Sequence, residues 1–468
     1  MVSLPCVLKN SLKLALVLTC LLSFPVQAQP RVVPQSTVQM QLSFAPVAKK
    51  VAPAVVNIYT TRKVQNRSPF MDDPFFGQFF RQFGGLSLGE RTVRSLGSGV
   101  IISEEGLVVT SHHVIKDSDE VKVVLADRRE MDGKIILTDD RSDLALLRIE
   151  AGGEKLPYLG LRDSDTLEVG DLVLAIGNPF GVGQTVTSGI ISALARTTAV
   201  GVADFQFFIQ TDAAINPGNS GGALVDMDGN LIGVNTAIYS TSGASNGIGF
   251  AIPANMVRTV VDSAEMGSNK VVRPWLGVTV QRMTQDIAES LGLKRPEGVL
   301  IADVASGSPA AKAGLKSGDV VLSINAYPVN DEQSMHFRSA ISPLNEYAEF
   351  TVLQNGQRRS VKVKMIAPPE NPLRDVRSLE GAHPLHGVKV ANLSPALAVE
   401  LGRNTSETGV VVLSARSARL MQPGDVIVEI NGTKINNTRQ LEKLMAKDSP
   451  SWHLLIKRGA QMLNVTIR

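Results

Sequence analysis

The stretch Asn216-Pro217-Gly218-Asn219-Ser220-Gly221-Gly222 sets one serine among glycines, and the rest of the chain is best interpreted from it. Glycine lets the backbone turn sharply, which leaves the Ser220 hydroxyl unobstructed. The same turn lets the N–H groups of Gly218 and Ser220 converge on one point. Two such donors form an oxyanion hole, and each lowers an acyl-transfer barrier by about 3 kcal/mol. We therefore expect Ser220 to be a nucleophile, with Gly218, Asn219 and Ser220 as its oxyanion loop. Taken alone, the stretch also fits a plain Gly-rich hairpin.

A serine nucleophile needs an adjacent base, which is normally histidine. The chain has six histidines, and of these just His112 and His113 precede residue 300. If this stretch is extended, the two side chains point to opposite faces, and periodicity alone does not choose between them.

The base in turn needs a carboxylate that fixes its tautomer. Asp143 fits this role because it stands directly before the apolar run Leu144–Ile149. Asp139 and Asp140 compete with it, but their polar turn predicts that both are solvated. The resulting order along the chain is His, Asp, Ser, as in the chymotrypsin arrangement.

Short β-branched runs bounded by Gly, Asp, Asn or charged residues predict two sets of about six strands, without a long amphipathic helix between them. We therefore expect two small barrels. The first set is Val55–Tyr59, Gly99–Ile102, Leu107–Thr110, Val121–Leu125, Lys134–Leu137 and Leu144–Ile149. The second set is Leu172–Ile176, Val186–Ala193, Phe205–Gln210, Ala223–Val225, Leu231–Thr236 and Gly249–Ile252.

The last third of the chain contains an internal repeat. Gly318–Asn325 matches Gly424–Asn431, and Gly298-Val299-Leu300 matches Gly409-Val410-Val411. Two copies of a domain of roughly 100 residues fit this better than a solenoid, which needs at least three repeats. The Pro-rich and charged stretch 367–384 is the expected linker between the copies.

Composition narrows the possible partners. The formal net charge is +3 and aromatic residues make up 5% of the chain, so neither a long basic tract nor a base-stacking surface is expected. Residues 1–28 resemble a secretory signal, with Lys9 and Lys13 ahead of an apolar run and small residues before a cleavage point. Both cysteines, Cys6 and Cys20, fall inside that leader, so the exported chain would have neither disulfides nor a thiolate metal site.

Five phenylalanines recur at helical spacing within an expected loop insertion, 62–92. They are Phe75, Phe76, Phe79, Phe80 and Phe83. A buried helix is one interpretation, but the flanking glycines and acidic residues favour an oligomer contact or an active-site lid.

Four ordered motifs now make a resemblance plain: Gly97–Ile102, Thr110–Ile115, Asp143–Leu147 and Gly218–Gly222. With them the chain resembles the HtrA/Deg serine proteases over about residues 45–468. In that family the catalytic histidine directly precedes Val-Ile, which maps it onto His113 and leaves His112 in a place often held by Asn. Asn219 stands where chymotrypsin relatives carry an Asp that binds a newly cut N-terminus, so activation by propeptide cleavage is not implied.

The resemblance implies a mainly β chain, with a two-barrel chymotrypsin-like protease domain followed by two PDZ domains. It further assigns a substrate-pairing strand to Val234, Asn235, Thr236, Ala237 and Ile238. It assigns a primary specificity pocket, for small or medium aliphatic side chains, to Ile248, Gly249 and Phe250. A PDZ carboxylate-binding loop is expected at Trp275, Leu276, Gly277 and Val278, and an activation loop at Arg196. The second copy carries Leu385-His386-Gly387-Val388 in the place of the carboxylate loop. The expected segments are a signal peptide (1–28), an arm (29–44), the protease domain (45–265), a first PDZ domain (266–366), the linker and a second PDZ domain (385–468).

The chain is thus expected to be an exported, periplasmic and ATP-independent serine endopeptidase. Unfolded or damaged polypeptides and exposed C-termini are its expected partners, in a homotrimer or a trimer-based oligomer with chaperone-like activity. No metal, cofactor or nucleic acid is expected, and membrane association is at most peripheral. The rival hypothesis is a non-proteolytic PDZ scaffold or chaperone with a vestigial protease fold.

Overall fold

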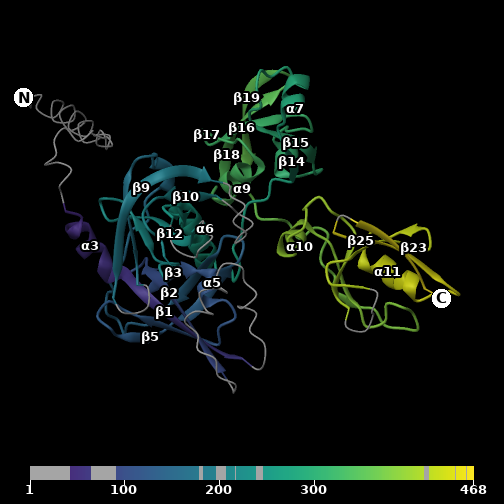
Figure 1. Ribbon diagram of the computed structural model, residues 1–468. Coiled ribbons are helices and arrows are strands. Elements are labelled where there is room, and N and C mark those ends of the chain that lie inside the picture. The colour runs from purple at the N-terminus through teal and green to yellow at the C-terminus, as the bar shows by residue number, and fades with distance from the viewer. Residues whose placement is uncertain are drawn as a thin grey trace, which may run out of the picture. The chain divides into compact units, whose positions relative to one another are not determined.

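The computed structural model describes residues 43–64, 91–178, 183–196, 207–216, 218–238, 246–415, 421–447, 449–459 and 461–467. Strands dominate these residues, as expected (Figure 1). Within them, every helix is too short or too polar to cross a membrane. The expected leader, most of the arm and the phenylalanine-rich stretch lie outside the described residues.

The first β domain is a seven-stranded antiparallel sheet in the order β5-β4-β1-β2-β3-β7-β6. Its strands are β1 (Val55–Val64), β2 (Arg91–Ile101), β3 (Leu107–Ser111), β4 (Glu120–Val124), β5 (Glu130–Asp132), β6 (Lys134–Asp139) and β7 (Leu144–Arg148). The short helices α3 (Ala45–Val51) and η1 (Ala52–Ala54) precede it, and α5 (His112–Ile115) follows β3. The expected first barrel is confirmed, because the two ends of this order meet: β5 and β6 are separated by Gly133 alone, so one bent strand pairs with β4 in its first half and with β7 in its second half.

The sequence pattern explains which strands lie inside. In β4, Val121 and Val123 alternate with exposed charged residues, as in a strand with one solvated face. The strand β7 is buried from Leu144 to Leu147, and it pairs with β3 on one side and with β6 on the other. The register sets Ser111 opposite Leu144, so the end of β3 lies beside the start of β7.

The second β domain is a closed six-stranded barrel in the order β10-β13-β12-β11-β8-β9. Its strands are β8 (Leu172–Gly177), β9 (Thr185–Arg196), β10 (Phe208–Thr211), β11 (Ala223–Val225), β12 (Leu231–Ile238) and β13 (Gly249–Pro253), with η3 (Ser164–Thr166) ahead of them. A helix that the strand pattern did not predict, α6 (Ala254–Glu265), follows β13 and contacts β12 and β7. Ala254, Val257 and Val260 recur every three residues and form its buried stripe.

The middle domain has a sheet in the order β14-β15-β16-β18-β19, with β17 paired to β16. Its strands are β14 (Val278–Arg282), β15 (Val299–Val304), β16 (Val320–Ile324), β17 (Tyr327–Pro328), β18 (Tyr347–Gln354) and β19 (Gln357–Lys364). Its helices are α7 (Gln285–Ser290), α8 (Pro309–Lys312) and α9 (Glu332–Ala340). The strand β14 forms one edge of this sheet.

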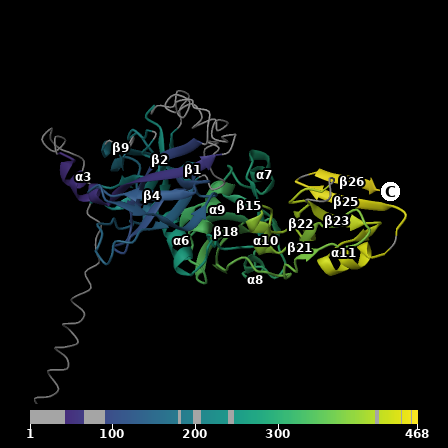
Figure 2. The same cartoon turned by 90° about the horizontal axis from the view of Figure 1, so that it is seen from below.

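The C-terminal domain repeats that order as β21-β22-β23-β25-β26, with β24 paired to β23 (Figure 2). Its strands are β21 (Lys389–Asn392), β22 (Val410–Ser414), β23 (Val426–Ile430), β24 (Thr433–Lys434), β25 (Trp452–Arg458) and β26 (Gln461–Ile467), and its helices are α10 (Pro395–Glu400) and α11 (Thr438–Met445). One strand is additional: β20 (Arg377–Ser378) pairs with β21. The stretch 367–384 is therefore not a simple linker, because part of it belongs to this sheet.

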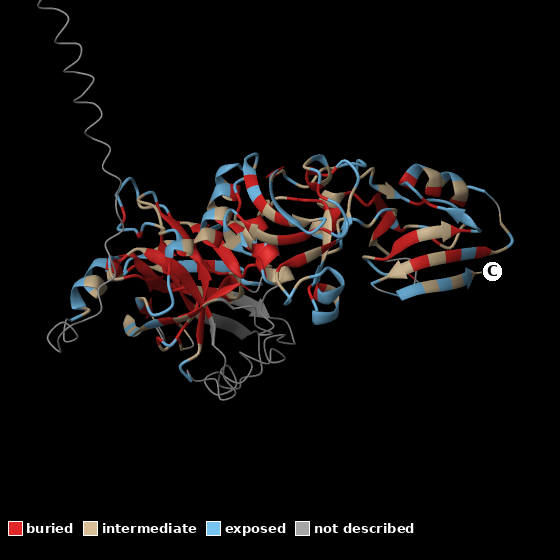
Figure 3. Cartoon of the chain, turned by 90° about the horizontal axis from the view of Figure 1, so that it is seen from above, coloured by how far each residue is buried: buried red, intermediate tan, exposed pale blue. Residues whose placement is uncertain are grey.

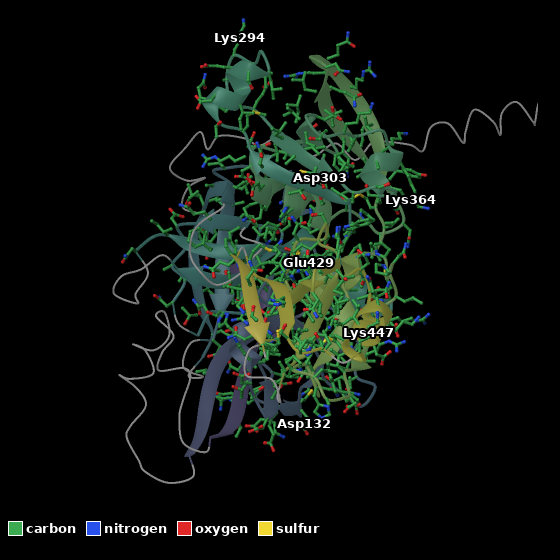
Figure 4. All side chains as sticks on the ribbon, turned by 90° about the vertical axis from the view of Figure 1, so that its right-hand side faces the viewer. Asp132, Lys294, Asp303, Lys364, Glu429 and Lys447 are labelled. Atoms are coloured by element: carbon green, nitrogen blue, oxygen red, sulfur yellow. The ribbon has the colours of Figure 1, made fainter. Side chains whose placement is uncertain are left out.

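Buried residues gather on the strands of each sheet (Figure 3). The middle and C-terminal domains have separate apolar clusters, built around Phe350 and around Ile427. Charged side chains such as Asp132, Lys294 and Lys364 lie exposed on the outside (Figure 4). Each domain thus has a core of its own.

Candidate active site

The predicted base lies at the end of a buried strand. All five residues of β3 are buried, and α5 begins directly after them. Val114 and Ile115 are buried and anchor this single helical turn. Gly97 of β2 makes room for it, since a Cβ at that position would lie 2.5 Å from Cγ1 of Val114. The expectation that His112 and His113 lie on extended chain is therefore wrong: both are helical.

The aspartate contacts one histidine twice. Asp143 Oδ2 lies 2.7 Å from Nδ1 of His113, and the His113 backbone N–H donates to Oδ1 at 2.9 Å. The backbone N–H of His112 donates to the Asp143 carbonyl oxygen at 3.0 Å. Asp143 itself has a left-handed backbone, with φ of 55°. The geometry thus makes His113 the partner of Asp143, in agreement with the choice made from the resemblance.

A threonine completes the surroundings of this carboxylate. The Thr236 hydroxyl donates to Asp143 Oδ2 at 2.5 Å, and the Thr236 carbonyl oxygen accepts the Ser220 hydroxyl at 3.2 Å. Thr236 therefore joins the predicted nucleophile to the Asp143–His113 pair. No sequence signal indicates this role, because nothing distinguishes the Thr236 hydroxyl from that of other threonines.

The pKa of Asp143 lies below its usual range, although the side chain is only 3% exposed. Burial alone would raise this pKa. The charge on His113 and the hydrogen bonds from His113 and Thr236 outweigh burial, because each favours the carboxylate. Asp143 is therefore ionised at neutral pH and can stabilise a protonated His113.

The two aspartates that compete with Asp143 differ: Asp140 is exposed, as predicted, whereas Asp139 is not solvated, which corrects the sequence prediction for that residue. Asp139 is 6% exposed and accepts hydrogen bonds from the Ser142 hydroxyl and from the Arg273 guanidinium. The backbone N–H of Ser142 also donates to it, at 3.1 Å. The buried Asp139–Arg273 pair thus holds the turn that presents Asp143.

The loop around Ser220 is fastened to β2. The Ser98 N–H donates to the Ser220 carbonyl oxygen at 2.9 Å, and the Ser98 hydroxyl donates to the Gly218 carbonyl oxygen at 2.7 Å. Gly221 has φ of 81°, and a Cβ there would lie 2.2 Å from the Ser98 carbonyl oxygen, so only glycine fits. The Asn219 N–H donates to the Asn216 carbonyl oxygen at 2.9 Å. Asn219 is thus removed from the expected oxyanion donors, and Gly218 and Ser220 remain.

The expected substrate strand is shorter than predicted. Val234 pairs with Ala223 of β11, and Asn235 exchanges backbone hydrogen bonds with Gly221 and Gly222. These two positions therefore have no free edge for a substrate. Thr236, Ala237 and Ile238 lie beyond the β11 pairing, while β13 flanks β12 as far as Ile238. An extended peptide could add to this edge, beside Ser220.

The structure describes all three residues of the expected specificity pocket. Gly249 faces Ile215, because a Cβ at Gly249 would lie 2.8 Å from Cδ1 of Ile215. Ile248 is half-buried. Phe250 is 2% exposed, and its ring lies 5.7 Å from that of Phe208. The barrel core contains their strand neighbours Ala251 and Ile209, so the two rings lie on the opposite face of the sheet. The role of these residues in substrate specificity stays a prediction.

The predicted PDZ loop precedes β14. The Trp275 N–H donates to the Ile366 carbonyl oxygen at 2.7 Å, so it is unavailable to a ligand. Gly277 has φ of 73°, and its carbonyl oxygen accepts the Ala305 N–H at 2.8 Å. The candidate carboxylate donors are thereby narrowed to Leu276, Gly277 and Val278. The loop lines a cavity together with Val280 of β14 and with Met335, His336 and Ser339 of α9.

Two of the predicted sites are only partly described by the structure. Arg196 ends β9, but its side chain lies outside the described residues, so its activation role stays a prediction. The side chains of Ala237 and Ile238 are likewise not described, although their backbones are.

Two parts of the chain match the models of known domain families. Residues 97–234 match the trypsin-like peptidase domain, and residues 274–365 match the PDZ domain. The chain is 39% identical over 438 residues to a probable periplasmic serine protease do/HhoA-like from Haemophilus influenzae, covering 91% of each. It is 40% identical over 423 residues to a probable periplasmic serine endoprotease DegP-like from Marinomonas sp., covering 87% of this chain and 89% of that one. A solved structure, the HtrA-type protease AlgW with decapeptide, is 45% identical with a TM-score of 0.52, covering 70% of this chain and 99% of that one.

A trypsin-like peptidase domain joined to a PDZ domain makes this protein a serine endopeptidase. More narrowly, the chain belongs to the HtrA/DegP family of periplasmic serine proteases, and it is a periplasmic protein.

Proposed function

We propose that Ser220 is the acylating nucleophile, that His113 transfers its proton and that Asp143 orients His113. The observation that carries this proposal is the hydrogen-bonded group formed by His113, Asp143, Thr236 and Ser220. The N–H groups of Gly218 and Ser220 stabilise the oxyanion, and Thr236–Ile238 pairs with the substrate backbone. The substrates are unfolded or damaged exported polypeptides, cleaved without ATP.

A fluorophosphonate probe and casein degradation test this assignment together. Ser220→Ala should abolish both reactions while thermal unfolding stays unchanged. His113→Ala should behave in the same way, whereas His112→Ala should keep most activity, because Asp143 contacts the His113 side chain. Labelling that persists without Ser220 would refute the nucleophile, and an absence of labelling in every oligomeric, ligand-bound state would favour the non-proteolytic scaffold.

We also propose that the middle domain captures exposed C-termini and thereby regulates the protease. The domain has the two features that such capture needs: an open strand edge at β14 and backbone N–H groups in the loop Leu276–Val278. The C-terminal domain, which repeats the same strand order, is a second PDZ domain. A trimer-based assembly and chaperone-like activity complete the proposal and rest on the family resemblance. Light scattering of the intact protein tests the assembly.

Two glycines provide a matched test of capture. Gly277 and Gly292 both have a left-handed backbone, with φ of 73° and 72°. A Cβ at Gly277 would lie 2.3 Å from Cβ of Ser308, whereas Gly292 has nothing within 4 Å. Gly277→Ala should therefore distort the loop and slow casein degradation without changing fluorophosphonate labelling, and Gly292→Ala should affect neither. Equal casein rates in the two variants would remove the loop from substrate capture.

A further inference from the structure

The edge of the C-terminal sheet is already occupied. Its strand β21 corresponds to β14 of the middle domain, but β21 pairs on both sides. Residues 373–379, here called the covering segment, run antiparallel along it. Arg377 lies opposite Val390, and the Asn392 N–H donates to the Arg374 carbonyl oxygen at 2.7 Å. The Asn392 side-chain amide also donates to the Leu373 carbonyl oxygen, at 2.8 Å.

The covering segment also occupies the carboxylate-binding loop of this domain. The Gly387 N–H donates to the Leu379 carbonyl oxygen at 2.7 Å, and the Leu379 N–H donates to the Val388 carbonyl oxygen at 3.0 Å. Gly387 stands where the middle domain has Gly277. In C-terminal recognition, backbone N–H groups of such a loop hold the last residue of an added strand. Leu379 therefore takes the place of a ligand's terminal residue.

The Leu379 side chain fills the position of an apolar anchor. It is 1% exposed and belongs to the core cluster with Val388 and with Leu441 and Met445 of α11. Polar contacts to α11 hold the rest of the covering segment. They are Thr438 Oγ1 to Asp375 Oδ2 at 3.0 Å and Arg377 Nη1 to Glu442 Oε2 at 2.5 Å. The covering segment thus lies between β21 and α11, in contact with both walls of the groove.

The middle domain shows the opposite state of the same architecture. Among the residues that the structure describes, its strand β14 ends the sheet, and Val280 and Met335 line a cavity to which Val399 and Thr405 also belong. An incoming strand finds unpaired backbone groups there, whereas at β21 the chain itself has satisfied them.

We propose that the covering segment is a built-in ligand of the C-terminal domain and closes that groove to free C-termini. This deepens the proposed capture of C-termini, on which it rests, by assigning capture to the middle domain alone. The two PDZ copies then differ in function: one is a receptor, and the other carries its ligand within the chain.

A reversible lock tests the proposal in the full chain carrying Ser220→Ala, which prevents cleavage of the probe. Ser378 and Lys389 lie directly opposite each other and are both exposed, so S378C/K389C should form a disulfide across the two strands. The only native cysteines, Cys6 and Cys20, lie in the expected leader. A fluorescent peptide that ends in valine with a free carboxylate should bind at one site per chain, equally in the oxidised and reduced forms. Binding that is lost on oxidation and restored by reduction would overturn the proposal, as would failure of the cysteines to cross-link.

Hydrogen exchange separates this proposal from the one on which it rests. The amides of Leu379, Gly387 and Asn392 should be protected without peptide, and saturating peptide should leave their exchange unchanged. The amides of Leu276–Val278 should become protected when peptide binds. If the peptide binds nowhere, the proposed capture of C-termini by the middle domain is refuted. The built-in ligand is then still tested by the exchange of the Leu379, Gly387 and Asn392 amides without peptide. Fast exchange at Leu379 and Gly387, or protection there that appears only with peptide, would refute the built-in ligand.

Discussion

Replacing Thr236 by valine removes one hydroxyl from a buried carboxylate and keeps the shape of the side chain. Asp143 Oδ2 then retains His113 Nδ1 at 2.7 Å but loses the Thr236 hydroxyl at 2.5 Å. The backbone carbonyl of residue 236, which accepts the Ser220 hydroxyl, is unchanged. The perturbation therefore acts on the orientation and charge of Asp143 rather than on Ser220.

The size of the effect follows from the burial of Asp143. A hydrogen bond to a charged group contributes about 1.5–3 kcal/mol. Asp143 is 3% exposed, so water does not readily replace the lost donor. The carboxylate stabilises His113 most when the imidazole is protonated during attack, so the loss falls mainly on the transition state. At about 1.4 kcal/mol for each tenfold change in rate, kcat/KM should fall about 10- to 100-fold.

The assay is kcat/KM on a chromogenic peptide, with Thr236→Ser as the matched control because serine keeps the hydroxyl. We expect T236V to be impaired and T236S to stay within a few-fold of wild type, with thermal unfolding alike in both. A T236V enzyme within twofold of wild type would refute the reasoning. Equal impairment of T236S would show that the methyl group, rather than the hydroxyl, carries the effect.

Three further predictions concern the Asp143 turn and its neighbours. Asp139→Asn should lower the free energy of unfolding by about 3 kcal/mol, because it leaves the buried Arg273 charge without its anionic partner. Denaturant titration measures this loss of stability. Glu104→Gln is the control, because it breaks only an exposed ion pair and should leave Tm unchanged. Equal loss of stability in the two variants would contradict the burial of the Asp139–Arg273 pair. Burial is the main cause that holds the pKa of His112 below its usual range. The unfolded chain therefore binds a proton at this histidine at a higher pH than the folded chain does. As a result, stability is lost as pH falls below about 6.5. His112→Asn should therefore lose less stability than wild type between pH 7 and 5, and parallel stability–pH curves for the two would count against this. Gly221→Ala should abolish activity and lower Tm, because its Cβ would meet the backbone of β2, and an active, fully stable G221A enzyme would disprove that close approach.

Local patterns determined much of this protein from the sequence. The runs of β-branched residues gave the strands, because alternation and flanking glycines are properties of a few neighbouring residues. The glycines around Ser220 marked the nucleophile loop, since only glycine permits the backbone of Gly221 so close to Ser98. The repeat in the last third likewise indicated two domains of one topology before any contact was known.

Tertiary structure decided what depends on residues far apart in the chain. The His113 side chain is distinguished from that of His112 by its contact with the carboxylate of Asp143, which lies 30 positions away. Asp139 is polar and ends the short strand β6, where a solvated turn is a reasonable expectation, but Arg273 lies beside it and comes from 134 positions away. Thr236 became part of the site in the same way, through its contact with Asp143. The covering segment has a linker's composition, yet it pairs with β21 because that edge had unsatisfied backbone groups within its reach. Composition and spacing record local preference, whereas ion pairs, shared hydrogen bonds and the pairing of an open edge exist only after the chain has folded.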